Sequence, residues 1–596
     1  LSGPMMVLAG PGSGKTSVIV ERTAYMINEG GISPSNILVV TFSRAAAKEM
    51  KERFLSFTGQ QYTPVTFGTF HGVFYGILKQ AYGFTAANIL SDEEKFGILR
   101  ELTLNYGGDL AEEGDFPEEI AREISVVKGN KIALEHYYSS CCPDEVFRQI
   151  YQGYREACQS RRKLDFDDMI LYCYELFVQR KDILEAWQKK FQYILVDEFQ
   201  DINQLQYDIV RMLAKPQNNL FIVGDDDQSI YHFRGARPEI MLNFTRDYPD
   251  AETVTLDVNY RCSGQILSAA MHVIGENKKR FSKKLSTPNQ VGKAVQIREF
   301  QNPREEYLAV VSELRERMEN GERLEDTAIL LRTNQEAEGL VGALMERQVP
   351  FNMKEKLPNL FQHWICRNLL AYMHFAAGEK NRKYFLEFMN RPNRYISRDA
   401  LSLSSVVSFE ELKEFYKDKD WMCDRITTLE THLRVLKSLA PYAAINFIRK
   451  GMGYEEYLRE YAEYRKIKPE ELSEILDRLT ESTKGMNSLE EWESYIEEYT
   501  EKLEEQARKA EQEREGVLIS TLHGVKGLEY EQVYILNVNE GSMPYRKAVL
   551  EPAIEEERRL FYVGMTRARK QLALCYVRQQ YEKKREPSRF LKEAGV

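Results

Sequence analysis

The sequence lacks any C-x-x-C pair, although it contains eight cysteines among its 596 residues. The cysteine spacing therefore indicates neither a zinc site nor a disulfide framework. No apolar run approaches the roughly 20 residues needed to cross a bilayer, and no charged and then apolar signal peptide opens the chain. We therefore expect a soluble cytoplasmic protein with reduced thiols.

An excess of basic charge is also missing, because 91 acidic residues outnumber 81 lysines and arginines and give a net charge of −10. This balance argues against a protein that coats nucleic acid with its whole surface, but it leaves room for a locally basic cleft. The length exceeds that of one hydrophobic core and suggests about four domains. Because the first residue is Leu1 and not methionine, we expect a short N-terminal segment to precede it.

Residues 9–16 form the most informative single motif of the chain. They read Ala-Gly-Pro-Gly-Ser-Gly-Lys-Thr and lie between an apolar run (5–8) and a helical pattern (17–27), as in a phosphate-binding P-loop. Ala9 stands where the usual pattern has its first glycine. Lys15 supplies positive charge to the terminal phosphates, and the Thr16 hydroxyl reaches Mg²⁺. The N–H groups that face the phosphates belong to Gly10, Gly12, Ser13 and Gly14.

Two carboxylates end a later apolar strand at residues 194–196. A P-loop enzyme needs one acid to hold Mg²⁺ and another to orient and deprotonate water, and we assign these roles to Asp197 and Glu198. A further strand at residues 221–223 leads into an acidic loop that ends at Gln228, a candidate sensor of the γ-phosphate. Tyr231 and Phe233 follow; such rings either stack on unpaired bases or pack in the core.

Short apolar runs separated by helical patterns predict an α/β fold with parallel sheets. A first unit is indicated by residues 5–8, 37–40, 193–196 and 220–223. A second unit is indicated by residues 253–256, 328–331, 517–520, 533–536 and 572–577. The stretches 86–185 and 375–508 have helical patterns and read as insertions.

Several motifs together resemble those of superfamily 1 helicases of the UvrD/Rep/PcrA type. Besides the P-loop, they are residues 41–50, 68–71, 165–168, 197–201, 224–236, 259–261, 521–529 and 558–570, in the family's order. The resemblance implies two RecA-like P-loop motor domains, each with a mainly helical inserted subdomain. It divides the chain into a first motor domain (1–85 and 186–258) with insertion 86–185, and a second motor domain (259–374 and 509–596) with insertion 375–508.

The resemblance also assigns further roles in binding ATP. Gln228 would couple the γ-phosphate to the DNA groove, Tyr260 would stack on adenine, and Glu529 would accept from the ribose. Arg261 and Arg567 would act as arginine fingers on the transferred phosphoryl group. The positions that match DNA-contacting residues are Phe42, His71, Phe166, Tyr231, Phe233, Arg234 and His523.

Three segments depart from the family pattern or add little to it. At residues 332–338 the chain reads Glu336-Ala337-Glu338 where the family has Gln-Ser-Arg, which weakens the expectation of a phosphate contact. Residues 391–398 lack the glycines with which the family's second insertion approaches duplex DNA. We interpret the basic run 278–284 as a solvated surface.

The function implied by the resemblance is an ATP-dependent 3′ to 5′ DNA helicase and translocase in DNA repair or replication restart. Its cofactors would be ATP and Mg²⁺, and its partners single-stranded DNA and single-strand/double-strand junctions. Two alternatives stay open: a translocase that displaces bound proteins with little unwinding, and a nucleotide-binding assembly factor that does not hydrolyse ATP.

Overall fold

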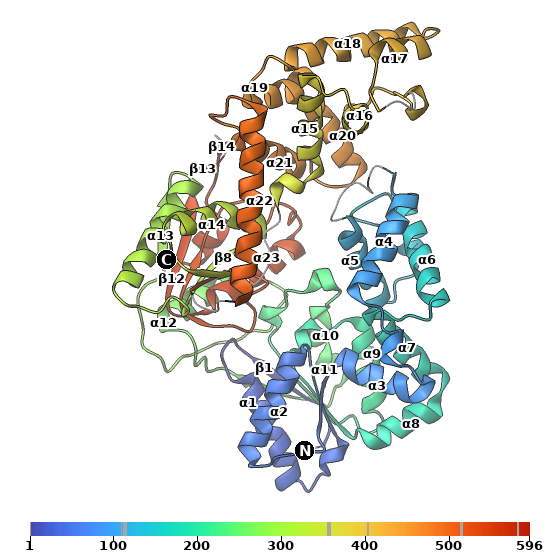
Figure 1. The fold of residues 1–596 in the computed structure, drawn as a ribbon. Coiled ribbons are helices and arrows are strands. Elements are labelled where there is room, and N and C mark those ends of the chain that lie inside the picture. Colours follow the sequence, from blue (N-terminus) through green and yellow to red (C-terminus); the bar gives the residue numbers. More distant parts are fainter. Residues whose placement is uncertain are drawn as a thin grey trace.

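The computed structural model contains two parallel six-stranded sheets. It describes residues 2–108, 110, 116–353, 359–401, 405–512, 516–580 and 583–595. For residues 506–512 it describes the backbone alone. We call the α/β domains around these sheets the first lobe and the second lobe. Figure 1 shows the first lobe at the bottom and the second lobe above it and to the left, with a group of helices above each. The predicted fold class, with two such α/β units, is confirmed.

The first sheet has the strand order β3-β2-β4-β5-β1-β6. Its strands are β1 (Met5–Ala9), β2 (Ile37–Thr41), β3 (Thr66–Thr69), β4 (Tyr193–Val196), β5 (Leu220–Gly224) and β6 (Glu252–Leu256). Successive side chains point to opposite faces: Met6 and Leu8 pack in one core layer, and Val7 and Ala9 in the other. One face of the sheet is covered by α3 (Phe70–Tyr82), α7 (Phe166–Gln179), α8 (Lys181–Lys190) and α9 (Gln204–Ala214). The opposite face is covered by α1 (Lys15–Asn28) and α2 (Arg44–Thr58).

The prediction that residues 253–256 belong to the second unit is wrong. Strand β6 pairs in parallel with β1, from Met5 opposite Glu252 to Ala9 opposite Leu256. It lies at the edge of the first sheet, and most of its residues are exposed. Because an edge strand buries little surface, its own sequence does not specify which sheet it joins.

The second sheet has the order β7-β12-β11-β8-β10-β9. Its strands are β7 (Gln296–Phe300), β8 (Thr327–Leu331), β9 (Phe351–Met353), β10 (Val517–Thr521), β11 (Tyr530–Ile535) and β12 (Ala568–Val577); a small hairpin of β13 (Gln579–Gln580) and β14 (Lys583–Lys584) follows. The covering helices are α12 (Gly264–Gly275), α23 (Glu551–Met565) and α24 (Arg589–Glu593) on one face, and α13 (Pro303–Glu319) and α14 (Ala337–Glu346) on the other.

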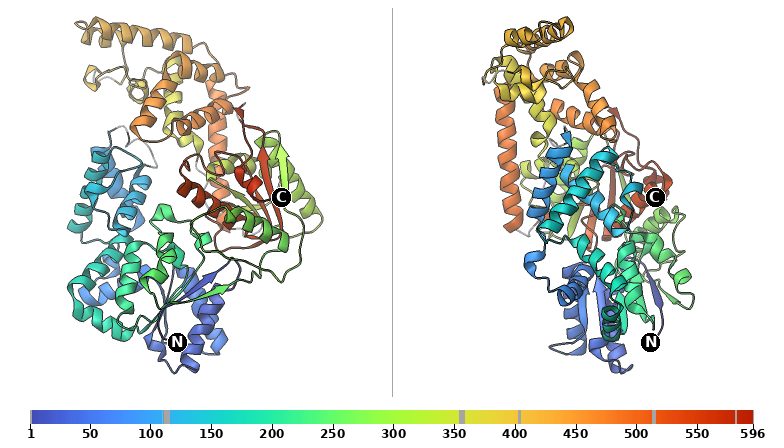
Figure 2. Two further views of the ribbon diagram at one scale, coloured as in Figure 1. Left: turned by 180° about the vertical axis from the view of Figure 1, so that it is seen from behind. Right: turned by 90° about the vertical axis from the view of Figure 1, so that its right-hand side faces the viewer.

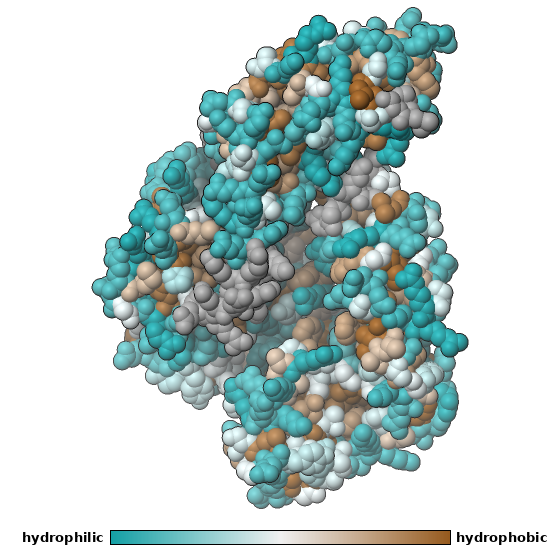
Figure 3. Space-filling view, in the orientation of Figure 1, coloured by the Kyte–Doolittle hydropathy of each residue, from teal (hydrophilic) through white to brown (hydrophobic). Residues whose placement is uncertain are grey.

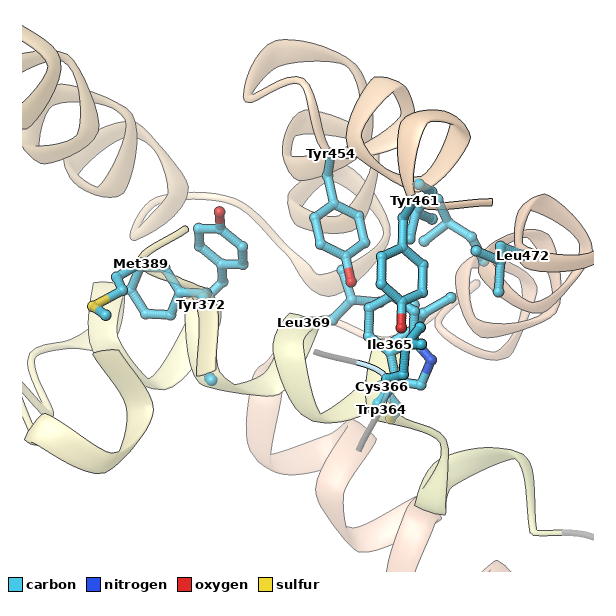
Figure 4. Close-up of a cluster of buried hydrophobic side chains, with 14 of the residues drawn as sticks. Trp364, Ile365, Cys366, Leu369, Tyr372, Met389, Tyr454, Tyr461 and Leu472 are labelled. Atoms are coloured by element: carbon cyan, nitrogen blue, oxygen red, sulfur yellow. The ribbon is translucent and has the colours of Figure 1, made fainter. Parts of the chain in front are cut away.

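Two helical groups extend from the lobes and contact each other (Figure 2). One contains α4 (Asp92–Tyr106), α5 (Phe116–Gly129) and α6 (Asp144–Ser160). The other contains α15 (Trp364–Ala377), α16 (Arg382–Phe388), α17 (Phe409–Phe415), α18 (Asp420–Leu436), α19 (Pro441–Asn446), α20 (Tyr454–Tyr464), α21 (Pro469–Ser482) and α22 (Leu489–Gln512). Figure 4 shows its core, where Tyr454 and Tyr461 of α20 approach Leu369 and Ile365 of α15. An ion pair of 2.6 Å between Lys466 and Asp144 joins the two groups.

The surface in the orientation of Figure 3 is mostly hydrophilic, with small scattered apolar patches. Within the described ranges, no helix combines the length and the apolar character that crossing a bilayer requires. All eight cysteines are free thiols.

Candidate ATP and nucleic-acid site

Except for Phe166, which begins α7, the predicted site residues of the first lobe follow the carboxyl ends of its parallel strands, which share one edge of the sheet. The P-loop follows β1, Phe42 follows β2, and Asp197 and Glu198 follow β4. Parallel sheets bind ligands at this edge, because the loops that leave all strands meet there.

The P-loop geometry suits an anion. Helix α1 begins at Lys15, and Gly14 before it has φ +85° and provides no side-chain cap, so N–H groups of the first turn remain available to phosphate. Thr16 lies in the same turn. The Ser13 hydroxyl donates to the carbonyl of Gly10 at 2.9 Å and so braces the loop.

The second lobe contacts this loop directly. The Asn259 side chain is fully buried and donates to the Pro11 carbonyl at 2.6 Å. The backbone N–H of Tyr260 donates to the Gly12 carbonyl at 3.0 Å. A Cβ atom at Gly12 would lie 2.7 Å from Cβ of Arg261, so only glycine permits this close approach. The Tyr260 ring remains 62% exposed, beside the nucleotide loop.

The two carboxylates after β4 differ in charge state. Burial and the neighbouring Glu198 raise the pKa of Asp197 to about 7. Its Oδ2 accepts from Thr41, whereas its buried Oδ1 has no hydrogen-bond partner among the described residues. Burial alone would raise the pKa of Glu198, but Lys15, 3.2 Å from its carboxylate, and Lys526 outweigh burial and lower the pKa to about 2. Glu198 is therefore an ionised acceptor, and Asp197 offers a free oxygen to a cation.

Gln200 links this centre to the next loop and was given no role from the sequence, although it lies in the motif 197–201. Its amide donates to Glu198 at 2.5 Å, and its carbonyl accepts from the N–H of Asp225 at 3.0 Å. Gln228, the predicted γ-phosphate sensor, donates its amide to Asp225 Oδ2 at 2.6 Å. Asp225 therefore contacts both glutamines.

The two predicted arginine fingers lie together in the second lobe. Arg261 donates from Nε to Glu529 at 2.7 Å, which also places the predicted ribose acceptor in this corner. Arg567 is buried and donates from Nε to the Val563 carbonyl at 2.9 Å. Burial and the nearby Arg261 lower the pKa of Arg567 to about 9. Among the described residues no carboxylate forms an ion pair with Arg567, so this buried cation can attract a phosphate.

Lys526 extends from the second lobe into the catalytic centre, a contact that sequence reasoning did not assign. Its Nζ lies 2.5 Å from Asp201 Oδ2 and 2.8 Å from the Gln228 carbonyl. It also lies 4.0 Å from Glu198 and 4.9 Å from the centre of the Tyr231 ring. One side chain thus contacts two acids of the candidate nucleotide site, Asp201 and Glu198, and a candidate DNA-stacking ring.

Aromatic rings form a continuous series across the two lobes. Phe42 and Tyr231 are stacked at 5.7 Å with an angle of 3° between their planes. Phe233 follows at 6.0 Å from Tyr231, and His523 of the second lobe meets Phe233 edge-on at 5.3 Å. Arg234 lies over both Tyr231 and Phe233. Phe233 is 40% exposed and is therefore not a core residue, whereas Tyr231 is half-buried and packs against the hydrophobic core of the second lobe.

His71 and Phe166 form a separate pair of rings, 5.5 Å apart and edge-on. Phe166 is 44% exposed at the start of α7. The buried Lys128 contacts the neighbouring Asp165 at 2.9 Å and Asp168 at 2.7 Å, which fixes the turn that presents the ring.

The interpretation of the basic run 278–284 as solvated surface is wrong in part. Lys278, Lys279 and Lys284 are exposed. Arg280 and Lys283 instead form ion pairs with the acidic loop after β5, and the Lys283 side chain is only 1% exposed. Their carboxylate partners lie more than 50 residues earlier in the sequence, so the run alone does not show that they are paired.

The segments that depart from the family pattern have local explanations. The Glu336 carboxylate accepts from the N–H groups of Arg332 and Thr333, each at 3.0 Å, so these groups are not available to a phosphate. In the segment 391–398, Tyr395 has φ +61°, a conformation that favours glycine, and its ring is 61% exposed beneath the Arg425 guanidinium. The backbone thus adopts a glycine-like turn but carries an exposed ring.

Two α/β lobes that meet over a P-loop, with acids from one and arginines from the other, define a two-lobed P-loop nucleotide-binding protein. Residues 1–249 match the UvrD/REP helicase N-terminal domain, and residues 254–579 match the UvrD-like helicase C-terminal domain. The chain therefore belongs to the UvrD/Rep family of helicases.

Three relatives in this family are 31–34% identical to this chain. The putative ATP-dependent DNA helicase YjcD of Bacillus subtilis is 34% identical, over 99% of this chain and 79% of the relative. DNA helicase II of Escherichia coli is 32% identical, over 99% and 85%. The ATP-dependent DNA helicase Rep of Escherichia coli is 31% identical, over 100% and 92%.

Proposed function

We propose that this protein is an ATP-dependent DNA helicase that moves 3′ to 5′ on single-stranded DNA and unwinds duplex during DNA repair or replication restart. The names of the relatives support the activity. The observation that carries the proposal is Lys526, whose ammonium lies 2.5 Å from Asp201, 4.0 Å from Glu198 and 4.9 Å from the centre of the Tyr231 ring of the aromatic series. Nucleotide chemistry and base stacking thereby share one side chain.

On the nucleotide side, Lys15 and the loop residues Gly10, Gly12, Ser13 and Gly14 bind phosphates. Thr16 and Asp197 would hold Mg²⁺, a role supported by the unpartnered Oδ1 of Asp197. The ion would neutralise phosphate charge and orient the triphosphate. Glu198 accepts the proton of the attacking water, and Gln228 reads the γ-phosphate.

The second lobe completes the nucleotide site when the cleft closes. Tyr260 stacks on adenine and Glu529 accepts from the ribose. Arg261 and Arg567 stabilise the charge that develops on the transferred phosphoryl group. Because these arginines lie on the lobe opposite the P-loop, hydrolysis depends on closure.

On the nucleic-acid side, stacking on aromatic rings needs no sequence preference, because every base has a flat face. The proposed contacts are Phe42, His71, Phe166, Tyr231, Phe233, Arg234 and His523. Burial and the nearby Arg332, Arg234 and Lys526 lower the pKa of His523 to about 3, so it is a neutral ring at physiological pH. The DNA substrate includes single-strand/double-strand junctions. The boundaries between the motor domains and their insertions lie at residues 85, 185, 258, 374 and 508.

ATPase activity with and without single-stranded DNA tests this proposal, followed by unwinding of duplexes with a 3′ or a 5′ tail. We expect DNA-stimulated hydrolysis and unwinding of the 3′-tailed duplex. A rate of ATP hydrolysis that single-stranded DNA does not change would contradict the proposal that the protein is a DNA motor.

A translocase with little unwinding is the second candidate. Tyr395 and the occupied N–H groups beside Glu336 favour it, because both remove backbone surface that can approach DNA phosphates. Movement on single strands without separation of a 3′-tailed duplex would select it. An assembly factor without hydrolysis is disfavoured by the complete set of Lys15, Glu198, Gln228, Arg261 and Arg567.

A further inference from the structure

Residues 277–286 form a connecting segment between the lobes. Its start is fixed to α23 of the second lobe: the Asn277 side chain donates to the Glu555 carbonyl at 2.9 Å and accepts from Arg558 at 2.7 Å. The N–H of Lys278 donates to the Glu555 carboxylate at 2.7 Å. Arg559 of α23 also donates to the Lys279 carbonyl at 3.3 Å, whereas Arg280, Phe281 and Lys283 contact the first lobe.

That contact is made with three consecutive buried carboxylates, Asp225, Asp226 and Asp227, whose oxygens lie within 4.8 Å of one another. Lys283 Nζ lies 2.5 Å from Asp225, 2.6 Å from Asp226 and 2.8 Å from Asp227. An ammonium has three N–H donors, so this group uses all of them on three acceptors. The ammonium occupies the place that a metal ion would need.

The remaining oxygens of the cluster are also paired. The Arg280 guanidinium donates two hydrogen bonds to the Asp227 carboxylate, each at 2.7 Å, and the N–H of Phe281 donates to Asp226 at 2.8 Å. The second oxygen of Asp225 accepts from Gln228. All six carboxylate oxygens of this acidic cluster therefore have partners, and buried networks are stable only in that condition.

Charge balance makes Lys283 essential to the cluster. Three buried carboxylates repel one another and lose hydration, so they require nearby cations to stay ionised. Burial alone would lower the pKa of Lys283, but the three carboxylates outweigh it and raise the pKa above the ordinary value. Without Lys283, one cation, Arg280, would face three acids.

The cluster reaches the nucleotide site through Asp225. Its carboxylate holds the amide of Gln228, and its N–H holds Gln200, whose amide reaches Glu198 at 2.5 Å. The loop that follows places Ile230 in the core of the second lobe and then Tyr231 and Phe233 in the aromatic series. A shift of Asp225 would therefore move two groups that face ATP and, along the chain, the stacking rings.

We propose that Lys283 is a positioning residue for ATP hydrolysis: it lies on the segment between the lobes, holds the Asp225–Asp227 loop, and thereby sets Gln228 and Glu198 for turnover. This inference rests on the proposed function. Misplacement of catalytic groups by about 1 Å costs on the order of 10²-fold in rate. The P-loop itself is untouched by Lys283, so nucleotide affinity should not change.

Steady-state ATPase assays on K283M test the inference, with K284M as the matched control, because Lys284 is the exposed neighbour on the same segment. We expect the DNA-stimulated kcat of K283M to fall roughly 10- to 100-fold, the KM for ATP to stay within twofold, and the ratio of stimulated to basal rate to drop. K284M should match the wild type. A merely structural role would change KM and kcat together.

The double variant K283M/D226N removes one positive and one negative charge and keeps the Arg280–Asp227 pair. We expect it to fold with a near wild-type Tm and still to show the lowered kcat. Wild-type turnover in a folded K283M or K283M/D226N would overturn this inference but would leave the proposed function standing. A wild-type protein without DNA-stimulated ATPase activity would overturn the proposed function and this inference with it.

Discussion

Substitution of Lys526 by methionine tests the coupling between the lobes most directly. The change keeps the length of the side chain but removes the ammonium that contacts Asp201 at 2.5 Å and the Gln228 carbonyl at 2.8 Å. The P-loop and Lys15 keep their own contacts. We therefore expect ATP binding to persist and closure of the lobes to weaken.

The size of the effect follows from the buried carboxylate that is left behind. Breaking a buried ion pair by removing one partner costs about 3–5 kcal/mol when the other charge has no escape. Burial already raises the pKa of Asp201 to about 6 with Lys526 beside it, so without the lysine Asp201 can take up a proton near neutral pH. This escape reduces the cost to about 1–3 kcal/mol, which corresponds to a closed population lowered by roughly 5- to 150-fold.

The assay is ATP turnover as a function of single-stranded DNA concentration. K526M should show a DNA-stimulated kcat reduced on the order of 10- to 100-fold, with a KM for ATP close to that of the wild type. The matched control is K592M, because Lys592 is an exposed lysine on α24. A folded K526M whose stimulated kcat stays within twofold of the wild type would refute this reasoning.

Three further predictions follow from single residues. E198Q should leave ATP binding intact and lower turnover at least ~10²-fold, because it removes the proposed general base; near-normal hydrolysis by E198Q would show that Glu198 does not have this role. F233A should weaken the affinity for single-stranded DNA by roughly 1–3 kcal/mol, because one aromatic ring on which a base can stack is lost. Fluorescence anisotropy measures this affinity, and an unchanged value would show that no base stacks on Phe233. Burial raises the pKa of Glu306 to about 8, so between pH 4.5 and 8 the folded state binds more protons than the unfolded state and the free energy of unfolding falls as pH rises. E306Q should therefore raise the Tm at pH 8 by a few degrees and leave it nearly unchanged at pH 4.5, whereas an equal shift at both pH values would contradict this origin.

Buried elements of the fold were predictable from the sequence because their burial leaves a pattern. Strands β2, β4, β5 and β8 are buried along nearly their whole length and appear as short apolar runs. Strands β3, β7 and β9 were not predicted, since they lie at sheet edges and nearly all their residues are half-buried or exposed. A short apolar pattern does not show which strands pair with one another, which is why β6 was assigned to the wrong unit.

The candidate site divides in the same way. Residues on one motif, such as Lys15 to Thr16 or Asp197 to Glu198, could be assigned roles because their spacing is local. Contacts between distant segments could not: Lys526 meets Asp201 across 325 residues, and Lys283 meets Asp225 across 58. A buried lysine and a solvated lysine look alike in a sequence, and only the fold shows which carboxylates surround it.

The acidic cluster and Lys526 are contacts through which a movement of one lobe would reach the other. The loop after β5 is covalently part of the first lobe, but Ile230 lies in the apolar core of the second lobe and Lys283 holds the loop by three ion pairs. Those contacts are buried and expensive to break, so this loop moves with both lobes and lies near the pivot of any closure. The lobes are also in contact at the nucleotide edge, because the buried Asn259 side chain donates to the Pro11 carbonyl at 2.6 Å and the Tyr260 N–H donates to the Gly12 carbonyl at 3.0 Å. Rotation about the loop would break these two hydrogen bonds to open the ATP edge, and it would change the spacing between His523 and the rings of Tyr231 and Phe233 on the same loop.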